Sequence, residues 1–109
     1  MIIDFSIMEE KRLTEFKGGK GDTIARMHTD EMGKIMYGKL EPGSSIGFHK
    51  HETGSEIIYI LSGKANFLYD GETEEITADG CHYCPKGHSH SMINNGDENL
   101  IFFAVVPEQ

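Results

Sequence analysis

The chain has few basic residues and no long apolar segment. Its 10 lysines and arginines stand against 18 aspartates and glutamates, which gives a formal charge of −8 at pH 7. This charge argues against nucleic acid or a membrane surface as a partner, because both are usually anionic and repel an acidic protein. The longest apolar run, Leu100 to Val106, is far too short to cross a bilayer. No basic segment precedes an apolar stretch near the N-terminus, so we expect no secretory signal and a cytoplasmic location.

Cysteine is also scarce, and the two that occur, Cys81 and Cys84, are three positions apart. That spacing is found in zinc and redox motifs. In an extended segment, however, residues three apart point to opposite faces, so His82 would share a face with Cys84 while Cys81 points away. We therefore expect two ordinary thiols of a reducing compartment rather than a disulfide or a second zinc site. Neither His82 nor His28 gives a sign of function.

A chain of 109 residues has room for one domain and a single core. Glycines and acidic turn residues recur along it and leave segments of strand length between them. The segments expected as strands are Thr23–Thr29, Lys34–Glu41, Ser45–His51, Glu56–Leu61, Lys64–Tyr69, Glu74–Thr77, His82–Cys84, Ser89–Asn94 and Leu100–Val106. No window has a clear helical period, although Met8–Phe16 could form one short turn or helix. The pattern predicts an all-β sandwich or barrel.

Histidines carry the strongest functional signal. His49 and His51 are one residue apart, so in an extended strand their imidazoles point to the same face. Glu56 follows a turn-prone stretch and can return to that face if the chain reverses there. A second pair with the same spacing, His88 and His90, lies in the second half of the chain. Imidazole and carboxylate groups together suit divalent first-row metals, so the pattern predicts a metal site.

The spacing of these residues resembles the two signatures of the cupin family, small β-barrels with a metal inside the barrel. The positions that match the first signature are Gly43, His49, His51, Glu56 and Gly63. The segment PKGHSHSMIN resembles the second signature, and its matching positions are Pro85, Gly87, His90 and Asn94. One departure lies just upstream, where the family usually has Gly-Asp and this chain has Asp79-Gly80; it concerns a turn and no ligand.

The resemblance implies an all-β fold, a single-domain double-stranded β-helix of the jelly-roll type. We assign residues 23–109 to this barrel and residues 1–22 to an N-terminal segment, a candidate dimer or barrel-edge element. The resemblance also implies one divalent transition metal per chain, Fe, Mn, Ni, Co or Zn. Its implied ligands are His49, His51, Glu56 and His90.

Four further residues are expected close to the metal. His88 shares a strand face with His90, so it is a candidate fifth ligand or a hydrogen-bond donor behind a ligand; the alternative is a rim histidine that faces solvent. Met92 continues the alternation and is expected in the core or the pocket wall. Ile58 and Ile60 share the face of the carboxylate ligand and are expected to form a dry lining beneath the metal.

Three imidazoles and one carboxylate leave positions open for water or substrate, which is typical of a working rather than a structural metal. Cupins with such ligands include dioxygenases, decarboxylases, lyases and isomerases. We expect action on a small chelating or oxygen-rich molecule, with dioxygenase-like chemistry slightly favoured. Two alternatives stay open: a non-catalytic, metal-dependent binding or sensing module, and a structural barrel with a vestigial site. We also expect a homodimer, with the tail Leu100–Val106 or the N-terminal segment as its surface.

Overall fold

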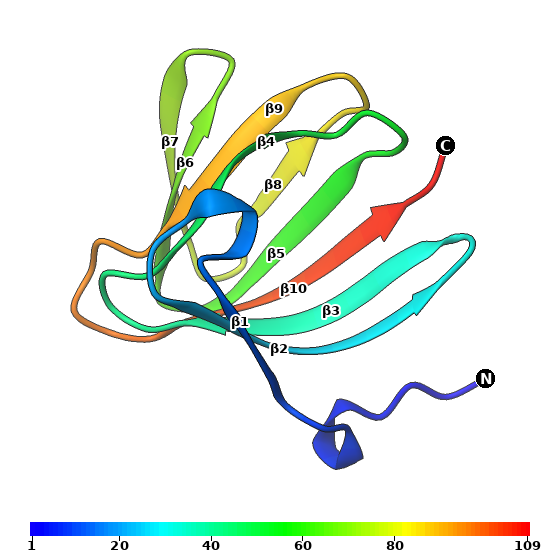
Figure 1. Cartoon of the computed structure of the whole chain (residues 1–109). Coiled ribbons are helices and arrows are strands. Elements are labelled where there is room, and N and C mark those ends of the chain that lie inside the picture. Colours follow the sequence, from blue (N-terminus) through cyan, green and yellow to red (C-terminus); the bar gives the residue numbers. More distant parts are fainter.

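The computed structural model describes residues 1–109 as two antiparallel sheets with no α-helix (Figure 1). The strands are β1 (Lys11–Thr14), β2 (Asp22–Asp30), β3 (Gly33–Leu40), β4 (Ser45–Lys50), β5 (Glu56–Ser62), β6 (Lys64–Tyr69), β7 (Glu72–Thr77), β8 (Cys81–Cys84), β9 (Ser89–Ile93) and β10 (Leu100–Pro107). Two 3-10 helices, η1 (Phe5–Ile7) and η2 (Phe16–Gly18), accompany them. All nine strands expected from the sequence are present, with ends within two residues of the predicted ones. Neither 3-10 helix is long or apolar enough to cross a membrane.

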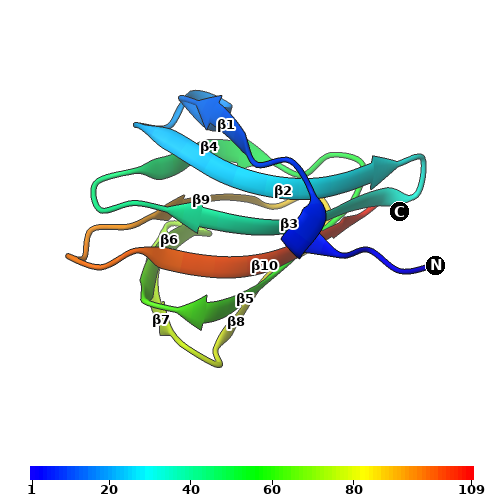
Figure 2. The ribbon, with the colours of Figure 1, turned by 90° about the horizontal axis from the view of Figure 1, so that it is seen from below.

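The larger sheet has the order β1-β2-β3-β10-β5-β8, and the smaller one has the order β4-β9-β6-β7. Figures 1 and 2 show the two sheets curving around a common interior. Neighbouring strands in each sheet come from distant parts of the chain; β10, the last strand, lies between β3 and β5. This arrangement confirms the predicted all-β jelly-roll barrel, and it brings β4, β5 and β9 to one region of the interior.

Alternation along the strands builds the core. In β10, Leu100, Phe102 and Ala104 are fully buried, while the residues between them are partly exposed. Phe102 lies opposite Gly38 of β3, where a Cβ atom would come within 2.3 Å of the phenyl ring. A glycine is required there because the ring fills the space of any side chain. Twelve buried apolar residues form this one core, which Leu13 and Phe16 of the N-terminal segment extend.

The expectation of a turn or helix over Met8–Phe16 is wrong for most of that segment. Lys11–Thr14 forms β1, which pairs antiparallel with β2, with Arg12 opposite Ile24. Only the last residue of the predicted stretch enters a helical turn, η2. A short segment without a helical period gains little from an isolated helix, whereas the free edge of β2 offers backbone hydrogen bonds.

Candidate metal centre

The four residues predicted as ligands come together between the two sheets. His49 of β4 lies directly opposite His90 of β9 in the smaller sheet. His51 follows β4, and its backbone N–H donates to the carbonyl of His88, 2.9 Å away, which keeps it aligned with the neighbouring strand. Glu56 opens β5 in the larger sheet, after the chain has reversed. One imidazole or carboxylate from each position points to a shared space.

The ligand atoms of this cluster lie close together. The Nε2 atom of His51 is 3.2 Å from Nε2 of His49, 3.0 Å from Nε2 of His90 and 3.0 Å from Oε1 of Glu56. Oε1 of Glu56 is also 2.9 Å from Nε2 of His90. All four ligand atoms lie within 4.8 Å of one another. The four groups could therefore hold one metal ion.

The donor set fits such an ion better than it fits hydrogen bonding alone. A neutral imidazole nitrogen carries either one proton or one lone pair, so the single Nε2 atom of His51 cannot serve three close partners. A divalent cation at the centre would satisfy all four groups at once. Two ligands at right angles on bonds of about 2.1 Å are about 3.0 Å apart, and tetrahedral ligands are about 3.4 Å apart. Four of the six pairs of ligand atoms are 2.9 to 3.2 Å apart, which is nearer to the right-angle spacing.

The electrostatics of the cluster favour the forms that bind metal. Burial by itself would raise the pKa of Glu56, but the contacts of its carboxylate with the imidazoles of His51 and His90 outweigh this effect and hold the pKa at about 2. Burial lowers the pKa of His49, against the effect of its hydrogen bond to the Gly47 carbonyl. An ionised carboxylate and a neutral imidazole are the species that coordinate a cation.

Hydrogen bonds behind the cluster orient two of its rings. Nδ1 of His49 is 2.7 Å from the carbonyl oxygen of Gly47, so this nitrogen donates and leaves the Nε2 lone pair facing the cluster. Nδ1 of His90 is 3.0 Å from Nε2 of His82, and Nδ1 of His82 is 2.8 Å from a carboxylate oxygen of Glu74. Protons on both Nδ1 atoms complete a chain from Glu74 through His82 to His90. This chain also directs the Nε2 lone pair of His90 to the cluster.

His82 is the residue near the site that the sequence interpretation missed. It is buried, and its ring stacks on Phe67 with centroids 3.9 Å apart. The alternation that places it on the buried face with Cys84 was visible, and a buried histidine needs a polar partner. Those partners lie on β7 and β9, which no local pattern identifies. The structure confirms the opposite facing of the cysteines: Cys81 is exposed, Cys84 is buried, and both are free thiols.

His88 does not join the cluster. Its Nδ1 atom lies 3.3 Å from the hydroxyl of Tyr69 and 3.1 Å from the carboxylate of Asp70, and its ring stacks on Tyr69. The side chain is 41% exposed, which corresponds to the alternative of a rim histidine. A turn explains the difference: His88 N–H donates to the carbonyl of Pro85, and Gly87 has φ +90°. His88 therefore lies between this turn and the first residue of β9, at the rim of the barrel rather than inside the strand.

The three apolar residues predicted near the metal, Met92, Ile58 and Ile60, all lie in the buried core. None of them lines the cavity beside the cluster. Ile58 and Ile60 follow Glu56 on the buried face of β5 and lie inside the barrel, and their role as a dry lining beneath the metal stays a prediction.

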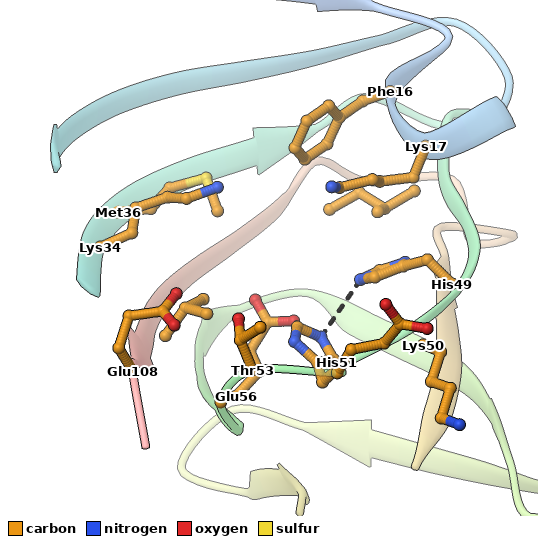
Figure 3. Close-up of a pocket in the computed structure, with 14 residues that line it drawn as sticks. Phe16, Lys17, Lys34, Met36, His49, Lys50, His51, Thr53, Glu56 and Glu108 are labelled. Carbon is orange, nitrogen blue, oxygen red and sulfur yellow. Dashed lines mark hydrogen bonds and ion pairs between the residues drawn. The ribbon is translucent and has the colours of Figure 1, made fainter. Parts of the chain in front are cut away.

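A cavity of about 250 Å³ adjoins the cluster. Figure 3 shows the imidazoles of His49 and His51 and the carboxylate of Glu56 on one side of it, with Lys17 and Lys34 on the other. Its apolar lining is formed by Phe16, Met36, Ile46 and Val106. The remaining lining residues are Lys50, Glu52, Thr53, Gly54 and Glu108. The cluster is thus accessible to a small molecule from one side.

The jelly-roll barrel and the three-histidine, one-glutamate cluster define a metal-binding cupin. Residues 36–106 match the family model of the cupin domain (Cupin_2), so the chain belongs to the cupin family. The chain is 36% identical to an oxalate-binding protein of Thermotoga maritima over 115 residues, which cover 97% of this chain and 93% of the relative.

Solved structures agree with this assignment. The crystal structure of a predicted oxalate decarboxylase from Thermotoga maritima is similar with a TM-score of 0.93 and 33% identity, over 100% of both chains. The polyketide cyclase RemF from Streptomyces resistomycificus has a TM-score of 0.81 at 21% identity, over 98% of this chain and 78% of the cyclase. The likeness to the cyclase concerns the fold alone.

Proposed function

We propose that this protein binds one divalent first-row metal through His49, His51, Glu56 and His90 and uses it to hold a small chelating carboxylate of the oxalate class. The observation that carries the proposal is the convergence of these four groups, three of which, His49, His51 and Glu56, line an open cavity. A bound ion would act as a Lewis acid that holds two oxygens of a chelating ligand. The oxalate-binding relative supports this class of ligand.

The size of the cavity favours a very small ligand. Sites for drug-sized molecules occupy about 300 to 1,000 Å³, whereas this cavity measures about 250 Å³. A two-carbon dicarboxylate is small enough for that space. Neither Thermotoga relative is described as a dioxygenase, so we now place carboxylate binding ahead of the dioxygenase-like chemistry that the sequence slightly favoured.

The spacing of the ligand atoms favours some metals over others. Right-angle ligand pairs suit six-coordinate manganese, iron, cobalt or nickel, while zinc in proteins is usually tetrahedral. With four protein ligands, a six-coordinate ion keeps two positions for the oxygens of a chelating ligand. We therefore propose manganese, iron, cobalt or nickel ahead of zinc.

Turnover of the bound carboxylate is the second candidate function. Glu52 and Glu108 also line the cavity, so a carboxyl group is available there to exchange a proton with a bound molecule. The relative described as a predicted oxalate decarboxylase points the same way. Binding without turnover and metal-dependent turnover differ in one observable: whether oxalate is consumed.

Calorimetry separates these possibilities. Protein loaded with Mn²⁺ should bind one oxalate per chain, and the apoprotein should bind none. Oxalate that is then recovered unchanged, with no formate or carbon dioxide, would establish a binding module, and its consumption would establish an enzyme. Equal oxalate binding with and without metal, or none with any of the five metals, would contradict the proposed function.

We also propose a homodimer that forms through the outer face of the larger sheet. Phe103 of β10 lies between Tyr37 of β3 and Tyr59 of β5, and Phe5 of the N-terminal segment packs on the first two of these rings. Exposed apolar side chains continue this face, among them Ile57. Monomeric proteins rarely expose a large continuous apolar face. Sedimentation at twice the chain mass of 12.2 kDa would support the dimer, and sedimentation at 12.2 kDa would contradict it.

A further inference from the structure

Two positive charges face the candidate metal centre from the opposite wall of the cavity. Lys17 extends from η2 and Lys34 from β3, and Figure 3 shows both side chains directed into the space above the imidazoles. Their ammonium groups lie on the ring of Phe16, 5.5 and 5.6 Å from its centroid. The aromatic ring supports both charges but supplies no counter-ion.

Neither lysine forms an ion pair within 4.0 Å, although Glu52, Glu56 and Glu108 line the same cavity. The lysine and arginine ion pairs within 4.0 Å involve Arg12, Arg26 and Lys64 instead. Burial lowers the pKa of Lys34, and the charge of Lys17 lowers it further, against the opposing effect of Glu56. Two like charges at one cavity repel each other, and an anion between them would remove that repulsion.

The position of Lys17 is held by an unusual backbone. Lys17 and Glu15 have φ values of 56° and 49°, a left-handed conformation that residues other than glycine rarely adopt. The turn lies against β4 with no space between the backbones: a Cβ atom on Gly47 would come within 2.1 Å of the Lys17 carbonyl oxygen. Since β4 also carries His49, the lysine and the cluster are fixed relative to each other. Strained backbone of this kind is concentrated at functional sites.

We infer that Lys17 and Lys34 make this site selective for a small dianion over neutral chelating molecules of the same shape. The inference rests on the proposed function, because it concerns the ligand held at the metal. Oxalate that chelates through one oxygen of each carboxylate group keeps two further oxygens with negative charge. Two ammonium donors on the facing wall match those oxygens with charge-assisted hydrogen bonds. A neutral diamide would leave both lysines without a counter-ion.

A series of three ligands tests this selectivity. Oxalate, oxamate and oxamide share a two-carbon skeleton and two chelating oxygens, and their charges are −2, −1 and 0. Titration calorimetry on Mn²⁺-loaded protein should give affinities that fall along this series. The substitutions Lys17→Met and Lys34→Met should each weaken oxalate binding about tenfold and leave oxamide binding unchanged. Lys17→Arg and Lys34→Arg should keep the preference for oxalate.

Lys39→Met is the matched control, because Lys39 lies on β3 as Lys34 does but five residues along, on the opposite face of the sheet. It removes the same charge and should not change oxalate affinity. A Mn²⁺ titration followed by electron paramagnetic resonance should give the same metal affinity for all variants.

The outcomes distinguish this inference from the proposed function. The role of the lysines is overturned if the Lys17→Met and Lys34→Met variants bind oxalate as tightly as Lys39→Met does. It is also overturned if their affinity for oxamide falls as much as their affinity for oxalate. In both cases the proposed binding of a carboxylate at the metal is unaffected. If Mn²⁺-loaded wild-type protein binds no oxalate, both are overturned. Oxamide bound as tightly as oxalate by the wild type would overturn the charge selectivity alone.

Discussion

The two His-x-His pairs of this chain have the same spacing but contribute different numbers of side chains to the cluster. In the first pair, His49 and His51 both direct Nε2 to the cluster. In the second pair, His90 does so, but His88 turns to Tyr69 at the rim. Residue type and spacing are identical in the two pairs, so the difference must come from the backbone.

The local backbone differs around the two outer histidines. His51 lies beyond the end of β4, yet its N–H donates to His88 O and its carbonyl accepts from Gly87 N at 2.7 Å, so it stays aligned with the next strand. His88 lies just past the turn in which its own N–H bonds to Pro85. Alternation predicts where a side chain points only while the backbone stays extended, and a turn resets it. The same histidine spacing can therefore supply two ligands or one.

Among substitutions in and around the two histidine pairs, the largest expected effect is the loss of the metal. His51→Ala or His90→Ala removes a ligand and should weaken metal affinity at least about a hundredfold. His88→Ala should change it by less than about threefold, because no metal contact is lost. Metal content after dialysis, measured by mass spectrometry, checks both. Equal losses in His88→Ala and His90→Ala would contradict the assignment of the rim histidine.

Acidification should release the metal in a defined pH range. Burial places the pKa of His49 in the folded protein below its ordinary value of 6.5, so the neutral form is favoured. A lowered pKa contributes stability that is present above the unfolded value and lost as pH falls through the folded one. Glu56, with a pKa of about 2, stays ionised in the range in which His49 becomes protonated.

Occupancy should therefore fall as the pH drops below about 6.5, through protonation of His49 rather than of Glu56. Dialysis at a series of pH values, followed by metal analysis, measures it. Glu56→Gln should lower occupancy at every pH and move the loss to higher pH, because a weaker site competes less well with protons for the imidazoles. Full occupancy of the wild type at pH 4.5 would count against histidine ligation.

A smaller effect is expected from the hydrogen bonds that link His90 to His82 and His82 to Glu74. His82→Phe keeps a ring against Phe67 but removes the acceptor of the His90 Nδ1 proton. Metal affinity should fall about ten- to a hundredfold, as it does when a hydrogen-bond partner of a metal ligand is removed. The neighbouring substitution Tyr83→Phe, at an exposed position, is the control and should have no effect. Unchanged metal affinity in His82→Phe would show that the hydrogen bond between His82 and His90 does not orient the imidazole of His90.

The smallest effect concerns the turn that separates the two pairs. Gly87→Ala should lower the free energy of unfolding by about 1 kcal/mol, because φ of +90° is strained for alanine although nothing lies within 4 Å of the new Cβ atom. Gly96→Ala is the control: its φ is ordinary and its Cβ atom would be 3.5 Å from Asn94. Urea unfolding of both variants measures the difference. A neutral Gly87→Ala would mean that this turn is not constrained by its left-handed residue.

Much of the fold and the cluster could be predicted because both follow from local patterns. The nine strands lie between turn residues, and alternation within them identifies the inward positions. The facing of Cys84 and Cys81 followed from the same rule and is confirmed. The convergence of His49, His51 and Glu56 with a histidine from the second signature required the additional information in the family spacing.

The remaining features depend on contacts between distant segments. Glu74 and His82 meet across strands of different sheets, and neither has a sequence neighbour that marks the contact. The N-terminal segment was predicted least well: its strand forms on the free edge of β2, and its left-handed turn at Lys17 requires close packing against β4. Such packing of backbone on backbone is a property of the assembled barrel, so no short window of sequence contains it.

Elemental analysis tests the central claim most directly. Protein purified without a metal-affinity column should contain, or take up on incubation with Mn²⁺, Fe²⁺, Co²⁺, Ni²⁺ or Zn²⁺, close to one ion per chain. The His90→Ala variant should lose that ion and the His88→Ala variant should retain it. Wild-type protein that neither contains nor takes up any of these five metals would contradict the account, whatever the shape of the barrel.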